Sequence, residues 1–313
     1  MRRTLVLILG VFALTLAPAA YGQTQVSTLT NGLSTFVNNA TASLPFASAA
    51  GLDWSDAYIG SIVGVPPHFG IGIVTGATTI PGKNLNPLIS ALGGSLPYSD
   101  LPIPLAAVNA RIGGFLLPFD VGLKVGTIPG GVTLNNYTIS YQNYGFDVRY
   151  ALFQGEPLLP DVSVGGGVDY FSSEITTPTL SSSASYSDGN GHTLGVGSPN
   201  AVLDLSALTF EAKLQVSKSL LILTPYLGLS GLVGSSTAKA TVNATVTGVN
   251  STTWSVPGLS STGFSQSNSQ AAFGLKVYGG TSINLFVFKL DLQGMYSFLD
   301  GAYGGTIGAR FQL

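Results

Sequence analysis

The sequence predicts an all-β fold: a transmembrane antiparallel up-and-down β-barrel of about twelve strands (ten to fourteen), preceded by a short helical segment. Charged residues make up only 8% of the 313 residues, against about 25% in an average protein, and the mean hydropathy is +0.41. After residue 22 there is no apolar run long enough for a spanning helix. A closed barrel is the other spanning structure that satisfies every backbone polar group.

Residues 1–22 are expected to form a cleaved signal peptide. Arg2 and Arg3 precede an apolar stretch from Leu5 to Leu16, and Ala20-Tyr21-Gly22 fits the small-x-small cleavage pattern. Cleavage would leave Gln23 as the mature N-terminus. Because the chain has no cysteine, disulfides and a cysteine-linked lipid anchor are excluded.

Residues 23–50 form the next segment and show a helical period. Their apolar side chains recur at three- and four-residue spacing, at Val26, Leu29, Leu33, Phe36, Val37 and Ala40. The segment could be a helix that plugs the lumen, a helix beneath the barrel, or the first strand. The spacing favours a helix.

Residues 51–313 are expected to form the barrel, because the period changes to two. Apolar residues alternate with charged or small ones in segments 108–116, 120–126, 144–153, 208–216 and 286–294, as in strands with one face toward lipid. A secreted β-sandwich also alternates, but its loops would be richly charged. Aromatic residues near the strand ends fit interfacial girdles, at Tyr58, Phe69, Tyr150, Tyr170, Tyr296 and Tyr303.

The connections alternate in length along most of this region. Short links are expected at 65–68, 117–119, 154–160, 217–222 and 280–284, and long loops at 81–104, 178–200 and 241–266, with a short helix at "NPLISAL" in the first of them. Bacterial barrels have short periplasmic turns and longer external loops. Both termini are therefore expected on the periplasmic side, with all three long loops outside.

The last strand carries a resemblance to a known class. Ile307, Ala309, Phe311 and Leu313 alternate with small or polar residues up to the final position. This pattern resembles the C-terminal assembly signal of bacterial outer-membrane β-barrel proteins, although the usual last residue is phenylalanine. The resemblance implies a location in the bacterial outer membrane, with membrane lipid and the barrel-assembly machinery as partners.

A second resemblance concerns the N-terminal segment. A helical stretch before a glycine-rich barrel is similar to the fatty-acid transporter barrels, whose N-terminal hatch plugs the lumen. This chain is shorter, and it has no motif that matches the hatch.

Charged residues lie in the middle of the strands, where a wet lumen would accept them. They are Arg111, Lys124, Asp147, Arg149, Asp169, Glu211, Lys213, Lys276, Lys289, Asp291 and Arg310. They could pair across neighbouring strands and fill a narrow barrel, or line a pore and set its ion preference. Seven bases against four acids predict a mildly cationic lumen with a weak preference for anions.

No catalytic, cofactor or metal site is expected. His68 and His192 are predicted at opposite ends of the barrel, "GLSGL" (228–232) lacks nucleophile-elbow spacing, and "VGGGVD" (164–169) lacks the phosphate-loop lysine. Removal of Arg2 and Arg3 leaves ten of the 12 basic residues against 14 acidic ones. The net charge is then negative, which argues against nucleic acid as a partner. The expected function is a channel or transporter for small solutes. The alternatives are a plugged transporter for hydrophobic compounds and a structural or adhesive barrel that acts through its external loops.

Overall fold

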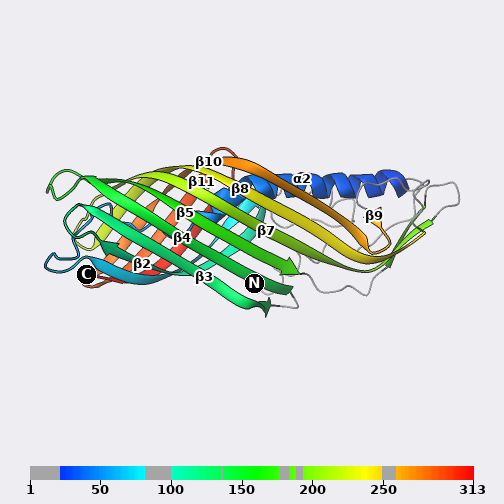
Figure 1. Cartoon of the computed structure of the whole chain (residues 1–313), viewed down its shortest axis with the longest axis horizontal. Coiled ribbons are helices and arrows are strands. Elements are labelled where there is room, and N and C mark those ends of the chain that lie inside the picture. The colour runs from blue at the N-terminus through cyan, green and yellow to red at the C-terminus, as the bar shows by residue number, and fades with distance from the viewer. Residues whose placement is uncertain (1–21, 82–99, 135–136, 177–182, 188–192, 249–258) are drawn as a thin grey trace.

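The computed structural model describes residues 22–81, 100–134, 137–176, 183–187, 193–248 and 259–313. Within these residues ten antiparallel strands close into a barrel, in the ring order β11-β12-β1-β2-β3-β4-β5-β7-β8-β10 with β10 paired back to β11 (Figure 1). Their bounds are β1 Phe69–Pro81, β2 Asp100–Gly113, β3 Phe119–Leu134, β4 Tyr137–Phe153, β5 Asp161–Thr176, β7 Thr193–Ser217, β8 Leu223–Thr247, β10 Gly263–Leu285, β11 Phe288–Ser297 and β12 Tyr303–Gln312.

The all-β barrel is confirmed, and the ten strands of its ring are the lower bound of the expected ten to fourteen; the count of twelve is not confirmed in the described part of the chain. The N-terminal segment contributes a helix and not a strand, and the wall begins at Phe69 and not at residue 51. Residues 49–68 form no strand. The two remaining strands, β6 (Ser183–Ser187) and β9 (Leu259–Ser260), pair with β7 and β10 outside the closed ring.

The expected helix is present as α2, Gly22–Ser48. Its apolar residues at three- and four-residue spacing are buried at Leu33, Phe36, Val37, Ala40 and Leu44. They pack inside the barrel against inward-facing residues of the wall, including Ile103, Phe171 and Leu205. Among the described residues, no helix is both long and apolar enough to cross a membrane.

The two ends of the barrel differ. The turns 114–118, 154–160, 218–222 and 286–287 lie at the end where Leu313 finishes, called here the short-turn end (Figure 1). The last of these turns was expected at 280–284, but those residues belong to β10. At the opposite end β7, β8 and β10 extend to 25, 25 and 23 residues, against 10 each for β11 and β12. We call this the long-strand end.

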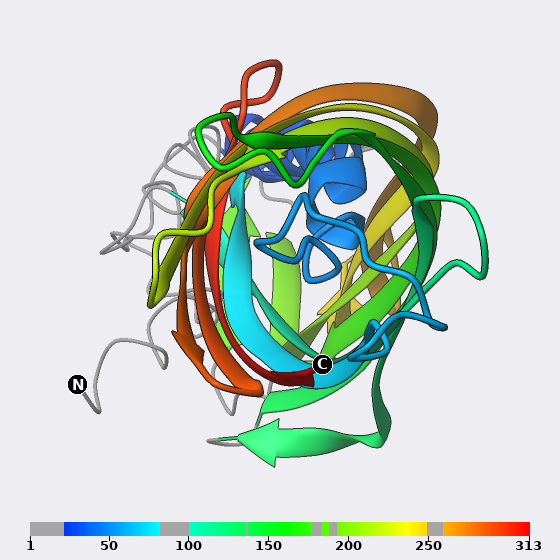
Figure 2. The same cartoon turned by 90° about the vertical axis from the view of Figure 1, so that its left-hand side faces the viewer.

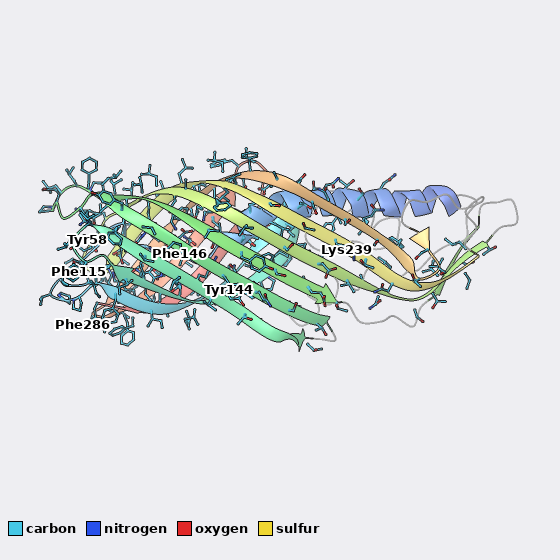
Figure 3. All side chains as sticks on the ribbon, viewed as in Figure 1. Tyr58, Phe115, Tyr144, Phe146, Lys239 and Phe286 are labelled. Atoms are coloured by element: carbon cyan, nitrogen blue, oxygen red, sulfur yellow. The ribbon has the colours of Figure 1, made fainter. Side chains whose placement is uncertain are left out.

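The side-chain pattern of the long strands reverses along their length. On β8, the outward residues toward the short turns are apolar, at Leu227, Leu229 and Val233, and their inward neighbours include Thr224 and Ser230. Further along, the outward residues are polar and the inward ones apolar: Ser235, Thr237 and Lys239 face out, whereas Ala238, Ala240 and Val242 are buried. Figure 3 shows Phe146 and Lys239 on either side of this change.

The reversal divides the barrel into two zones. The zone with an apolar exterior spans about ten residues per strand, as a membrane-crossing strand requires. Between this zone and the long-strand end, the long strands form a sheet with a polar exterior around α2. Tyr144 and Tyr170 stack at the boundary with ring centroids 6.3 Å apart, where an aromatic girdle belongs.

Most of the expected girdle residues lie on the outer wall. Phe69, Tyr150, Tyr170, Tyr296 and Tyr303 are exposed there, each on an outward-facing position of its strand. Tyr58 is an exception, because it precedes β1 and lines a cavity at the short-turn end.

Gly22 does not lie at the same end of the barrel as Leu313, although both termini were expected on one side of the membrane. Helix α2 ends at Ser48 near the middle of the lumen, where Ser48 Oγ donates to Thr209 Oγ1 at 2.7 Å, and its earlier residues reach β6 at the long-strand end. Gly22 and Leu313 therefore lie at opposite ends of the barrel. The expected signal peptide, the helix at "NPLISAL" and His192 fall outside the described residues.

Candidate functional site

Residues 22–60, called here the plug, lie inside the barrel (Figure 2), and residues 61–68 lead from the plug to β1 at the short-turn end. Toward the long-strand end the plug consists of helix α2. Toward the short-turn end the chain continues as an irregular segment. Gly51 makes the first bend there with a φ of +92°, and a Cβ at this position would meet Leu105 of the wall at 3.2 Å. The glycine therefore suits both the left-handed conformation and the close approach to the wall.

Side chains of the wall satisfy the backbone of this irregular segment. Asn109 donates to the carbonyl of Gly51 at 3.0 Å, and Arg149 donates to the carbonyl of Asp56 at 2.7 Å. Gln154 both accepts from the amide of Ile59 and donates to its carbonyl. Buried backbone groups need such partners, so the wall is built to hold this segment in one position.

Two carboxylates of the plug bridge basic residues of the wall. Asp53 contacts Lys213 Nζ at 3.0 Å and Lys276 Nζ at 2.9 Å. Asp56 contacts Lys289 Nζ at 2.8 Å and Arg310 Nη2 at 2.9 Å. These ion pairs join the plug to strands β7, β10, β11 and β12.

The eleven charged residues expected in the lumen all belong to this interior. Nine are buried, and Lys289 and Asp291 are partly exposed. Five of the bases form ion pairs with acids of the same set: Arg111 with Asp147, Lys124 with Asp169, Lys213 with Asp147 and Glu211, Lys276 with Glu211, and Arg310 with Asp291. Arg149 and Lys289 pair with acids outside the expected set.

Three acids missed by the sequence analysis complete the network. They are Asp53, Asp56 and Asp120, of which Asp120 accepts from both Arg111 at 2.7 Å and Arg149 at 2.6 Å. The expected set held seven bases and four acids, so these three bring the acids to seven. Among the described residues this network is therefore balanced, with seven bases and seven acids, and two of the seven acids belong to the plug.

A sequence signal for the missed acids existed. Asp53 and Asp56 are the first two acidic residues of the chain, and they flank Trp54 in the segment "GLDWSD". The excess of three bases in the expected set also called for counter-charges elsewhere, because a narrow lumen does not tolerate unpaired charge. Asp120 was overlooked although it begins an alternating segment.

Basic residues also meet the C-terminal end of α2. Lys124 Nζ donates to the carbonyls of Ser48 and Ala50, both at 2.7 Å, and Lys276 Nζ donates to the carbonyl of Ala49 at 3.1 Å. A helix C-terminus carries partial negative charge and unpaired carbonyls. The two lysines stabilise this end of the helix while pairing with acids of the wall.

Trp54 lies between two arginines of the wall. The guanidinium carbons of Arg310 and Arg111 are 4.7 Å and 5.7 Å from its ring centroid, within cation–π range. A Cβ at Gly70 of β1 would come within 2.7 Å of the Trp54 ring. The glycine thus leaves the space that the indole occupies, in keeping with the close packing expected of glycines in barrel strands.

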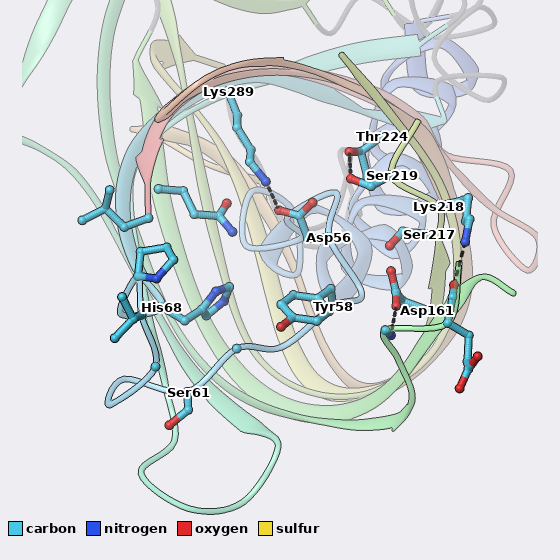
Figure 4. Close-up of a pocket in the computed structure, with 18 of the residues that line it drawn as sticks. Asp56, Tyr58, Ser61, His68, Asp161, Ser217, Lys218, Ser219, Thr224 and Lys289 are labelled. Atoms are coloured by element: carbon cyan, nitrogen blue, oxygen red, sulfur yellow. Dashed lines mark hydrogen bonds and ion pairs between the residues drawn. The ribbon is translucent and has the colours of Figure 1, made fainter. Parts of the chain in front are cut away.

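Below the plug, a cavity of about 620 Å³ opens at the short-turn end (Figure 4). We call it the vestibule. Its lining is polar and apolar in about equal parts: the polar residues include Asp56, Tyr58, His68, Ser217 and Lys289, and the apolar ones include Val65 and Phe286. His68, which was expected in a short periplasmic turn, is buried and has its ring centroid 6.4 Å from that of Tyr58. Burial lowers the pKa of His68 below its ordinary value, so the imidazole is uncharged at neutral pH.

Comparisons with known proteins find matches among solved structures only. No protein-family model matches the chain, and no curated protein matches it. Solved structures similar to it include the translocator domain of the autotransporter NalP from Neisseria meningitidis, with 10% identity, a TM-score of 0.31, and coverage of 95% of this chain and 100% of that one.

Another is Ail, the attachment invasion locus protein of Yersinia pestis, with 13% identity, a TM-score of 0.27, and coverage of 79% and 97%. Omp33 of Acinetobacter baumannii gives 8% identity, a TM-score of 0.25, and coverage of 79% and 98%. The resemblance of this chain to bacterial outer-membrane β-barrels is confirmed as an architecture by its closed barrel. At these TM-scores the neighbours carry no argument about function.

Proposed function

We propose that the protein is an outer-membrane transporter for small anionic solutes, closed at rest by its plug. The observation that carries the proposal is the placement of Asp53 and Asp56, which are bound by four bases of the wall. If the plug moves out, those bases lose two carboxylates. The described charged network of the wall then holds seven bases and five acids, an arrangement that attracts anions.

The outer membrane is the proposed location because the lower zone exposes apolar side chains around its circumference. Soluble proteins rarely expose apolar patches of more than a few hundred Å². The interior of this zone is polar and ion-paired, as in membrane barrels. In accord with the sequence analysis, we infer a non-enzymatic role, and small solutes, membrane lipid and the barrel-assembly machinery remain the proposed partners.

The vestibule suggests how a solute reaches the plug. Asp56 and Lys289 both line this cavity, and their ion pair lies at its upper wall (Figure 4). A small carboxylate or phosphate in the vestibule could compete with Asp56 for Lys289 and Arg310. Such competition weakens one of the two ion-pair anchors of the plug.

The test is ion conductance across planar lipid bilayers. We expect the wild-type barrel to conduct only rarely, and the double variant Asp53→Asn/Asp56→Asn to open frequently with anion selectivity in a salt gradient. Glu174→Gln, a matched loss of charge on the outer face of β5, should behave like the wild type. A double variant would overturn the proposal if it stays closed and still changes its migration in gel electrophoresis when heated, as a folded barrel does.

A structural or adhesive role is the second candidate. It is favoured by the sheet of β7, β8 and β10 above the apolar zone, whose outward residues are largely Ser, Thr and Asn. The expected long loops 178–200 and 241–266 include residues of β7, β8 and β10, so the test removes residues 178–192 or 248–262 only; this should abolish binding to a surface and leave conductance unchanged.

A further inference from the structure

The turns at the short-turn end carry large apolar side chains at their tips. Val65, Leu116, Leu158, Leu221 and Phe286 are each at least 83% exposed, and we call them the apolar rim. Figure 3 shows Phe286, and also Phe115 of another turn, projecting at this end. Turns that face water are normally rich in Gly, Asn, Asp and Ser, so this composition needs a physical cause.

Two members of the apolar rim occupy unfavourable backbone positions. Leu221 has a φ of 49° and Phe286 a φ of 57°, and both are fully exposed. Tight turns with positive φ strongly prefer Gly, Asn or Asp, and a bulky side chain there is an outlier. An apolar residue that is both strained and exposed gains nothing from folding alone, which suggests an apolar environment around it.

Hydrogen bonds hold the rim in a fixed arrangement. Lys218 Nζ donates to the carbonyls of Glu156, Pro157 and Leu159 at 2.6–3.0 Å, joining the turns that carry Leu158 and Leu221. The amide of Asn284 donates to the carbonyl of Ile222 at 2.8 Å, which joins the Phe286 hairpin to the same group. The tips are thus presented together.

We propose that the apolar rim lies in lipid, at the boundary between acyl chains and headgroups of the inner leaflet. The rim continues the outward apolar surface, because Leu221 precedes Leu223 and Leu227 on β8 and Phe286 precedes Phe288 on β11. From Leu221 to Val233 a strand tilted by about 45° rises roughly 28 Å, close to the hydrocarbon thickness of about 30 Å. The vestibule consequently opens at the headgroup level. This inference rests on the proposed membrane location and not on transport.

Spin-label depth measurements test the inference, and the cysteine-free chain suits them. Leu221→Cys, Phe286→Cys and Leu158→Cys would carry nitroxides in phosphatidylcholine vesicles. Leu229→Cys on the apolar exterior and Ser267→Cys on the projecting sheet provide the lipid and water references. We expect the rim labels to show an oxygen-to-nickel collision ratio below that of the Leu229 label and severalfold above that of the Ser267 label, as their proposed depth requires.

Rim labels with the accessibility of the Ser267 label would overturn the inference. Labels shielded from both reagents would also overturn it, and would indicate a second copy of the chain on this face. The Leu229 label separates the two proposals: without lipid exposure there, the membrane location itself fails. Heat-modifiable migration of each labelled variant verifies its fold, and conductance plays no part in the readout.

Discussion

At the scale of single residues, the interior of the apolar zone depends on ion pairs that bind the plug to the wall. Each carboxylate of the plug contacts two bases, and most of these side chains are less than a tenth exposed. Removing one partner of a buried pair costs far more than an exposed pair contributes, because the remaining charge is left in a poorly solvating environment. The plug is therefore most sensitive at Asp53 and Asp56.

Replacing Asp53 should destabilise the closed barrel. Asp53→Asn removes a carboxylate from Lys213 and Lys276, although Asp147 and Glu211 still pair with these lysines. We expect the free energy of unfolding to fall by about 3 kcal/mol, the lower end of the range for breaking buried pairs, in urea titrations of the protein in detergent micelles. Glu174→Gln should change it by less than about 0.5 kcal/mol. Equal effects of the two variants would contradict a buried ion-pair anchor.

Gly70 should resist even the smallest side chain. A Cβ there would lie 2.6 Å from the carbonyl oxygen of Phe311 and 2.7 Å from Trp54 Cη2, so Gly70→Ala should cost about 1–3 kcal/mol through overpacking. Gly231→Ala is the matched control, because the added Cβ meets nothing within 4 Å. The same urea titration compares the two, and a neutral Gly70→Ala would contradict close packing of β1 against both Phe311 and Trp54.

At the scale of elements, the strands were predictable because lipid and lumen impose a period of two. Segments 144–153 and 208–216 lie within β4 and β7, and the helical spacing of Leu33, Phe36 and Val37 predicted α2. Residues 49–60 were not recognised as a separate part of the plug, because a segment that is held by side chains such as Asn109 of β2 and Gln154 of the turn after β4 follows no period.

The reversal on the long strands was also missed, and for a related reason. Alternation gives the period but not which face is outward. On β8, Ser235, Ser236 and Ala238 are all small, so the sequence does not show where the apolar side changes from the outer face to the inner face. Only the buried contacts of α2 with the upper wall show that the apolar side there faces inward.

A cross-link between α2 and β7 should hold the plug in place. Ser48 Oγ and Thr209 Oγ1 are 2.7 Å apart, so cysteines at these two positions are close enough to form a disulfide when oxidised. Added to Asp53→Asn/Asp56→Asn, the pair should suppress the conductance until a reductant is supplied. Each single cysteine variant serves as a control. Conductance that persists with the disulfide formed would show that ions bypass the plug.

At the scale of the whole molecule, the two zones define how the barrel crosses its membrane. Thr237 on the projecting part of β8 should face the outside and Leu229 the lipid. A cysteine at Thr237 is therefore expected to react with a membrane-impermeant maleimide on intact cells, whereas a cysteine at Leu229, or at Glu156 in a short turn, is not. Labelling of the cysteine at position 156 but not of the one at position 237 would show that the barrel has the opposite orientation.

The course of the plug leads to the last prediction. Because Gly22 lies at the long-strand end and Leu313 at the short-turn end, an N-terminus at Gln23 would emerge on the outer side. An epitope inserted between Gln23 and Thr24 should be detected by antibody on intact cells, and one inserted after Glu156 only after permeabilisation. Detection of the first epitope only after permeabilisation would mean that the plug enters from below, and that α2 does not occupy the upper lumen in the mature protein.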